Sequence, residues 1–260
     1  MTDAIKIIFF DIDGTLVDME RKEITPKTLE TLQRLKERGV LLCLATGRGP
    51  LTLPHFEGVE FDAFLTFNGS YCFTREQTVF RNPLSPEDVQ TILRNAASIH
   101  RPVSIATKDK MVANGKDREL IDYYAVANRE IEVSNEFDQV AKEDVYQIML
   151  GCRREERPVL LRGVRRAKIA AWLDWAVDII PADGGKGVGI QSILAHYHLD
   201  KGSALAFGDG DNDMEMLQAV GHGVAMGNAS ERLKAVADDV CGDVTEDGVS
   251  AYCLAHGLLS

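Results

Sequence analysis

The sequence predicts an α/β fold: a parallel sheet covered by helices on both faces, interrupted by an inserted α+β domain. Strands and helices alternate at the two ends of the chain, and the strands there, such as 5–10 and 40–45, are near-continuous apolar runs. Such runs are typical of parallel strands buried on both faces. In between, short strands come in pairs with alternating polarity, which is typical of an antiparallel sheet.

The N-terminal region begins with the expected strand 5–10 and a helix that Thr25 caps. Pro26 is favoured at the first helical position, and leucines recur on one face until Gly39 ends the helix. The strands expected next are 40–45, 63–67 and the hairpin pair 71–74 and 78–81.

The pattern changes near Asn82-Pro83, so we expect one discontinuous domain of residues 1–82 and 183–260 and an inserted domain of 83–182. Its expected strands are 103–107, 110–114, 145–151, 167–172 and 176–180. Three helices are expected in this domain: one that begins at residue 86, one near 117–127 and one near 154–163. All three are expected on one face of the sheet. Tyr146, Asn114, Trp172 and Trp175 are its candidates for substrate contact, although burial in a core is the commoner role of such residues.

The first pattern then resumes with a helix from Lys186 to His198. The remaining expected elements are strand 203–207, a helix to Val220, strand 223–226, helix 230–237, a short strand near 240 and a helix from 249.

Polar turns that contain glycine follow three expected parallel strands: Asp11–Thr15, Thr46–Arg48 and Asp209–Asp213. Ligands of open α/β sheets bind beyond the carboxyl ends of the strands. Asp11 and Asp13 follow a buried strand directly, where two carboxylates repel each other and lose hydration. We therefore expect a cation beside them.

Each of these segments has an ordinary explanation when it is taken alone. An Asp-Gly pair forms turns, acidic residues favour helix starts, and a lysine such as Lys186 is usually exposed. Their order along one chain is the specific signal.

In that order, the chain resembles the haloacid dehalogenase superfamily of phosphohydrolases, in its Cof-type branch of sugar-phosphatase-like enzymes with a large α+β cap. The four matching motifs are Asp11-Ile12-Asp13-Gly14-Thr15, Thr46 in Ala45-Thr46-Gly47-Arg48, Lys186 in Gly185-Lys186-Gly187, and Gly208-Asp209-Gly210-Asp211-Asn212-Asp213. Asn68-Gly69 and Met226-Gly227-Asn228-Ala229 also resemble features of that branch. The resemblance implies a Rossmann-like core with residues 83–182 as the cap.

The resemblance also implies a mechanism and a metal. Asp11 would be the nucleophile and form an aspartyl-phosphate, and Asp13 would be the general acid and base. Mg²⁺ would be held by the Asp11 carboxylate, the Asp13 backbone carbonyl and the Asp209 carboxylate. The implied substrate-binding residues are Thr46, Gly47, Arg48, Lys186 and Asn212, and the implied site-organising residues are Asp213 and Asn68. For Arg48, pairing with a nearby acid is an equally open role, and Asp211 is expected only to start a helix.

The composition indicates which classes of partner the protein can bind. Acidic residues number 40 against 29 basic ones, a net charge of -11, which argues against nucleic acid or an anionic membrane as partner. The five cysteines show no metal or redox spacing, and no signal peptide or membrane-spanning stretch is visible. We expect a cytoplasmic enzyme, a monomer or homodimer, that acts on a small phosphorylated metabolite.

The leading hypothesis is a Mg²⁺-dependent phosphatase of sugar phosphates. Other phosphomonoesters, such as pyridoxal phosphate or a flavin nucleotide, and a phosphomutase reaction remain open. A non-catalytic module that binds phosphorylated metabolites is the alternative of a different class.

Overall fold

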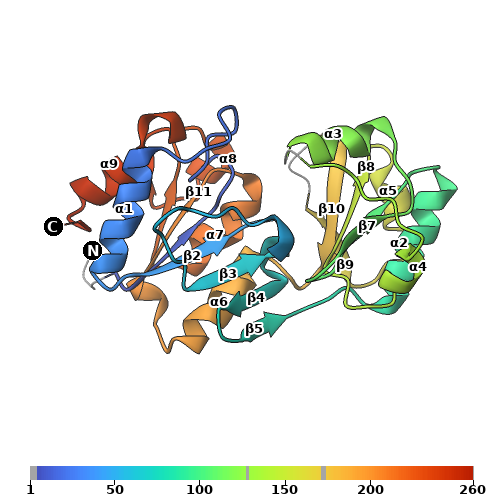
Figure 1. Cartoon of the computed structure of the whole chain (residues 1–260), viewed down its shortest axis with the longest axis horizontal. Coiled ribbons are helices and arrows are strands. Elements are labelled where there is room, and N and C mark those ends of the chain that lie inside the picture. The colour runs from blue at the N-terminus through green and yellow to red at the C-terminus, as the bar shows by residue number, and fades with distance from the viewer. Residues whose placement is uncertain (1–4, 127–128, 171–173, 260) are drawn as a thin grey trace. The chain divides into compact units, whose positions relative to one another are not determined.

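The computed structural model describes residues 5–126, 129–170 and 174–259, which form two compact units (Figure 1). Unit 1 takes in the chain up to Arg48, Leu53–Arg81 and the chain from Gly185 on. Unit 2 takes in Gly49–Thr52 and Asn82–Gly184. Across the described ranges, no helix is long and apolar enough to cross a membrane.

Unit 1 is built on a mostly parallel sheet. Its strands are β1 (Ile7–Phe10), β2 (Leu41–Ala45), β3 (Ala63–Thr66), β4 (Tyr71–Thr74), β5 (Thr78–Arg81), β11 (Ala204–Gly208), β12 (His222–Ala225) and β13 (Asp239–Val240). Within the described chain they form one eight-stranded sheet of order β13-β12-β11-β1-β2-β3-β4-β5. The pairings from β13 to β3 are parallel, and β4 and β5 add an antiparallel edge. The predicted Rossmann-like parallel core is confirmed.

Helices cover both faces of this sheet, as its continuous apolar strands predict. They are α1 (Pro26–Glu37), α6 (Lys186–His196), α7 (Met214–Ala219), α8 (Glu231–Lys234) and α9 (Gly248–Ala255). On one face, Phe10 stacks on Phe207, and Tyr252 of α9 packs edge-on against Phe207. On the other face, α6 packs so closely that a Cβ at Gly189 would lie 2.7 Å from Leu65 Cδ2.

Short 3-10 turns link several of these elements. They are η1 (Pro50–Thr52), η2 (Phe67–Gly69), η3 (Lys201–Ser203), η4 (Asp211–Asp213) and η5 (Val244–Glu246). Helix α1 begins as predicted: the Thr25 hydroxyl accepts a hydrogen bond from the backbone N–H of Thr28 at 3.1 Å, and Pro26 is its first residue.

Unit 2 contains the predicted antiparallel sheet. Its strands are β6 (Ser104–Ala106), β7 (Met111–Ala113), β8 (Gln147–Gly151), β9 (Ala167–Ala170) and β10 (Ala176–Pro181). In the described residues they pair antiparallel in the order β7-β6-β8-β10-β9. The ends of the expected strand 167–172 and helix 117–127 lie outside the described residues.

The expectation that the unit 2 helices share one face of the sheet is wrong. The helices are α2 (Pro86–Ser98), α3 (Arg118–Val126), α4 (Phe137–Val140) and α5 (Arg157–Leu160). Ile92 of α2 shares a core with Ile105 and Ile148, whereas the Tyr124 hydroxyl of α3 hydrogen-bonds the Ser104 hydroxyl. Successive residues of a strand point to opposite faces, so α3 lies on the other face. On that face, polar residues of the strands form hydrogen bonds with tyrosines of α3. The alternation of polar and apolar residues in the sequence does not reveal these contacts.

Candidate functional site

Asp11 follows β1 directly, in the middle of the unit 1 sheet. Its backbone N–H donates to the Phe207 carbonyl at 3.0 Å, which extends the pairing of β1 with β11. Because Phe10 faces α9, the next residue points to the face covered by α6. The Asp11 carboxylate is therefore buried, with 7% of the residue exposed, where α6 begins.

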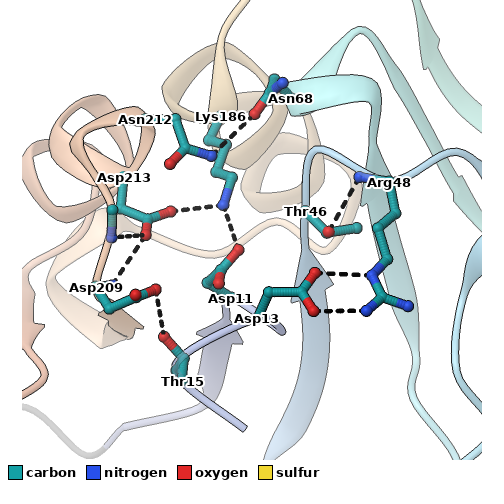
Figure 2. Close-up of polar contacts among 11 residues, drawn as sticks. Asp11, Asp13, Thr15, Thr46, Arg48, Asn68, Lys186, Asp209, Asn212 and Asp213 are labelled. Atoms are coloured by element: carbon teal, nitrogen blue, oxygen red, sulfur yellow. Dashed lines mark hydrogen bonds and ion pairs between the residues drawn. The ribbon is translucent and has the colours of Figure 1, made fainter. Parts of the chain in front are cut away.

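Lys186, the first residue of α6, places its ammonium group between two carboxylates (Figure 2). Its Nζ lies 2.6 Å from Asp11 Oδ1 and 2.5 Å from Asp213 Oδ1, and its side chain is fully buried. Burial alone lowers the pKa of the lysine, but the charges of Asp11 and Asp213 outweigh burial and raise it. The ammonium is thus a buried positive charge held between the two carboxylates.

Asp213 organises the turn after β11. Its Oδ2 accepts from the backbone N–H groups of Asp209 and Gly210, both at 3.0 Å, while Oδ1 is paired with Lys186. Both oxygens are occupied by donors, so Asp213 fits the organising role expected for it. The geometry leaves Asp11 and Asp209 as the carboxylates with acceptor capacity toward a cation.

Asp209 lies beside Asp11 and Asp213: one carboxylate oxygen of each falls within 4.8 Å of the others. Burial raises the pKa of Asp209 to about 7, and the Asp213 charge adds to the effect while Lys186 opposes it. Burial also raises the pKa of Asp11 well above its usual value; Lys186 opposes this shift, and the neighbouring carboxylates add to it. Negative charge therefore exceeds positive charge in this cluster, and one proton or cation is needed to balance it.

The residues fit Mg²⁺ as the balancing ion. The cluster offers only oxygen donors, which Mg²⁺ prefers. A Cβ on Gly14 would lie 2.2 Å from Asp209 Oδ2, so glycine at this position, with φ of 88°, is what lets the Asp209 carboxylate approach the first turn. The Asp13 carbonyl belongs to that same turn.

Asp13 is held by Arg48. The guanidinium donates from Nη2 to Asp13 Oδ1 at 2.5 Å and from Nε to Oδ2 at 2.7 Å (Figure 2). Of the two roles left open for Arg48, the structure shows pairing with an acid. While both Asp13 oxygens accept from Arg48, Asp13 cannot give a proton to another group, so the guanidinium must move off at least one oxygen for acid catalysis.

The segment after β2 and the segment after β3 lie together. Thr46 is buried, and its hydroxyl accepts from the Arg48 backbone N–H at 3.1 Å. A Cβ on Gly47 would lie 3.3 Å from Asn68 Nδ2, and Asn68 Oδ1 accepts from Asn212 Nδ2 at 3.1 Å. The structure thus brings every predicted site residue to one edge of the sheet in unit 1.

The turn that carries Asn68 has an unusual backbone. Phe67, Asn68 and Gly69 have φ of 51°, 53° and 84°, all in the left-handed region that bulky residues rarely adopt. A Cβ on Gly69 would lie 2.4 Å from the Gly185 carbonyl oxygen, so glycine allows this turn to pack against the start of α6. Such conformations cluster at functional sites.

Sequence reasoning assigned no role to Asn228, although it lies in a matched segment. Its Nδ2 donates to the Gly14 carbonyl at 2.8 Å, and its Oδ1 accepts from the Val244 N–H at 3.0 Å. Asn228 therefore ties down the turn that carries Asp13. Its place just after β12, at the same edge of the sheet, is the signal that could have found it.

Asp211 has a further contact beyond its helix start: it accepts from the Ser230 hydroxyl at 2.6 Å and from Arg232 at 2.7 Å. Among the candidates in unit 2, Tyr146 is fully buried, and Asn114 Oδ1 accepts from the Val103 N–H at 2.8 Å. Trp172 lies outside the described residues.

Three comparisons place the chain among known proteins. The family model described as haloacid dehalogenase-like hydrolase matches residues 8–252. The chain is 32% identical to the putative phosphatase YkrA of Bacillus subtilis (strain 168), over 98% of both chains. It is 28% identical to 5-amino-6-(5-phospho-D-ribitylamino)uracil phosphatase YitU of the same organism, over 95% of both.

Solved structures agree with the sequence comparisons. A sugar phosphatase of HAD subclass IIB is 28% identical and superposes with a TM-score of 0.88, over 97% of this chain and 99% of that one. The predicted resemblance to the Cof-type branch is confirmed. The chain belongs to the haloacid dehalogenase-like hydrolase family.

Proposed function

We propose that this protein is a Mg²⁺-dependent phosphatase that hydrolyses small phosphorylated metabolites, with sugar phosphates as the substrate class, through an aspartyl-phosphate on Asp11. The observation that carries the proposal is the buried Asp11–Lys186–Asp213 cluster beside Asp209, on a chain of a hydrolase family. The names of relatives support the substrate class: one is called a sugar phosphatase and another acts on a phosphoribityl compound.

Asp11 is the proposed nucleophile. One carboxylate oxygen forms a bond to phosphorus while the bond from phosphorus to the leaving oxygen breaks. Lys186 holds Asp11 Oδ1 at 2.6 Å, which leaves Oδ2 as the attacking atom. Burial removes water around this oxygen, so the charge of Lys186 and the cation set its reactivity.

Asp13 is the proposed acid and base. It gives a proton to the leaving oxygen, and then takes a proton from the water that attacks the phosphorus of the aspartyl-phosphate. This second attack releases phosphate and restores the Asp11 carboxylate. Arg48, once it leaves Asp13, has two N–H donors for a phosphate oxygen.

The Asp11 and Asp209 carboxylates and the Asp13 carbonyl would hold Mg²⁺, which when bound neutralises the excess negative charge of the site and polarises the phosphoryl group. Thr46, Lys186 and Asn212 are proposed to contact the phosphoryl oxygens. Unit 2 is proposed to act as the cap that recognises the rest of the substrate.

The test is phosphate release from a panel of sugar, polyol, pyridoxal and flavin phosphates, with Mg²⁺ and with a chelator. The Asp11→Asn variant is the matched control, because it keeps the size of the side chain and removes the nucleophile. Hydrolysis that depends on Mg²⁺ and on Asp11 supports the proposal. No phosphate release from any substrate, or release that persists in the Asp11→Asn variant, overturns it. An isomerised product in place of free phosphate would instead reveal a mutase.

A further inference from the structure

Asn228 lies in the loop after β12 and bonds two distant segments of unit 1. Its Nδ2 donates to the Gly14 carbonyl at 2.8 Å, and its Oδ1 accepts from the Val244 N–H at 3.0 Å. These partners are 214 and 16 residues away along the chain. The residue is exposed, and an exposed side chain loses rotamer freedom when it is held in one conformation. Two backbone bonds from one such carboxamide indicate a fixed connection between the segments.

The bond from Asn228 completes the hydrogen bonding of Gly14. The Gly14 N–H donates to the Val17 carbonyl at 2.9 Å, so the peptide groups on both sides of its Cα are held. Two planar peptide groups that are each held define the dihedral angles of the residue between them. Glycine leaves a conformation readily when it is not held, because it has no Cβ. Asn228 therefore keeps Gly14 at its φ of 88°.

The conformation of Gly14 decides how closely the first turn approaches Asp209. A Cβ on Gly14 would lie 2.2 Å from Asp209 Oδ2, so the Gly14 Cα is in contact with that carboxylate. The Thr15 hydroxyl, next in the turn, donates to Asp209 Oδ1 at 3.4 Å (Figure 2). The Asp13 carbonyl, a proposed ligand of Mg²⁺, belongs to the same turn. A shift of the turn would therefore change the distance between two proposed ligands.

The loop that carries Asn228 also holds Asp209. The Ser230 N–H, two residues after Asn228, donates to the Asp209 carbonyl at 3.2 Å. A Cβ on Gly227 would lie 2.7 Å from the Asp243 backbone nitrogen, so the loop packs closely against the next segment of the chain. One packed loop therefore contacts both turns that carry the proposed metal ligands.

We propose that Asn228 is a positioning residue for the divalent cation: through the Gly14 carbonyl it holds the first turn against Asp209, so that the oxygen ligands are in place before the ion binds. The inference rests on the Mg²⁺ site of the proposed function. Residues that orient metal ligands strengthen binding without touching the metal, because the ligands are then ordered in advance.

The Asn228→Ala variant removes the carboxamide and tests this role with and without metal. We expect the Kd for Mg²⁺, measured by calorimetry without substrate, to rise about tenfold, as it does when an outer partner of a metal site is lost. In chelator, the Gly14 amide should exchange with deuterium about tenfold faster, because a turn that has lost a hydrogen bond opens more readily. The kcat at saturating Mg²⁺ should change less than the Kd, because added metal restores the site.

Asn228→Asp separates the two bonds of the carboxamide. The carboxylate can still accept from the Val244 N–H but cannot donate to the Gly14 carbonyl. Its Gly14 amide should therefore exchange as fast as that of Asn228→Ala. Exchange at the wild-type rate would assign the effect to the Val244 bond and overturn the inference. Because it keeps one bond, this variant also takes the place of Asn228→Ala if that protein does not fold.

Asn95→Ala is the matched control, because Asn95 Nδ2 donates to the Leu160 and Arg162 carbonyls at 2.9 and 2.8 Å within unit 2. It should leave the Kd for Mg²⁺ and the Gly14 exchange rate unchanged. A wild-type Kd or a wild-type exchange rate in Asn228→Ala overturns the inference, and so do equal losses in Asn95→Ala. A wild-type protein that binds no Mg²⁺ would overturn the metal site of the proposed function, and the exchange rates in chelator would still decide whether Asn228 holds the turn.

Discussion

Replacing Lys186 with methionine tests the balance of charge that the site depends on. The variant removes a fully buried ammonium that lies 2.6 Å from Asp11 and 2.5 Å from Asp213, and leaves these carboxylates without a counter-charge. Breaking a buried ion pair in this way costs about 3–5 kcal/mol of the free energy of unfolding. At about 2–4 °C per kcal/mol for a protein of this size, the melting temperature should fall by about 6–20 °C.

The loss should depend on pH in a defined direction. Without Lys186, burial and repulsion from the neighbouring carboxylates raise the pKa of the Asp11 carboxyl in the folded protein still further above its unfolded value. The folded variant then holds protons that the unfolded chain releases, so its stability is greatest at low pH and falls as pH rises. Urea unfolding in chelator at pH 5 and pH 8 measures this, with the larger deficit expected at pH 8.

Arg232→Met is the matched control for that experiment. Arg232 lies 2.7 Å from Asp211 in an ion pair of similar length, but 74% of its side chain is exposed. Exposed ion pairs contribute about 0–1 kcal/mol to the free energy of unfolding, so the stability of this variant should be nearly that of the wild type. A Lys186→Met variant that loses no more stability than Arg232→Met would refute the reasoning, since the buried pair would then carry no more stability than a surface pair.

Three further outcomes follow from the same geometry. Asp11→Asn should lower kcat at least about 1000-fold while the metal-free protein melts no lower, because one buried like charge is gone; phosphate release and circular dichroism check this. Burial raises the pKa of Asp209 to about 7, so protons compete with Mg²⁺ for this carboxylate below that pH, and the affinity for Mg²⁺ should fall there. Mg²⁺ binding should therefore release protons at pH 6 but not at pH 8.5, which calorimetry in two buffers would measure. Gly14→Ala should weaken Mg²⁺ binding more than Gly39→Ala does, because both positions have positive φ but only the Cβ at Gly14 meets Asp209; equal binding in the two variants would contradict that account.

The sequence predicted the parts of this molecule that local patterns determine. Short stretches of sequence determine these elements: β1 and β2 are continuous apolar runs, and α1 starts at a capping residue. Their positions therefore follow from burial and capping. Asp11, Thr46 and Asp209 were predictable as candidates because each follows a parallel strand whose carboxyl end lies at one shared edge of the sheet. Lys186, which begins α6, was predictable only from the order of the motifs.

Contacts between distant segments were not predictable in the same way. Nothing local to Arg48 decides that it pairs with Asp13, and nothing local to Asn228 reveals the Gly14 carbonyl that it binds. The one-sided alternation of the unit 2 strands predicts helices on one face only, whereas Tyr124 of α3 hydrogen-bonds Ser104 on the other face. Both are consequences of tertiary packing.

The pairing of β1 with β11 also constrains how the protein is made. Ile7 pairs with Ala204, so the central strand of unit 1 lacks one of its neighbours until the chain beyond unit 2 has been made. The strands of unit 2 come from one continuous stretch and are complete by Pro181. During synthesis from the N-terminus, unit 2 can therefore fold first, while β1 has no partner on one side until β11 is made.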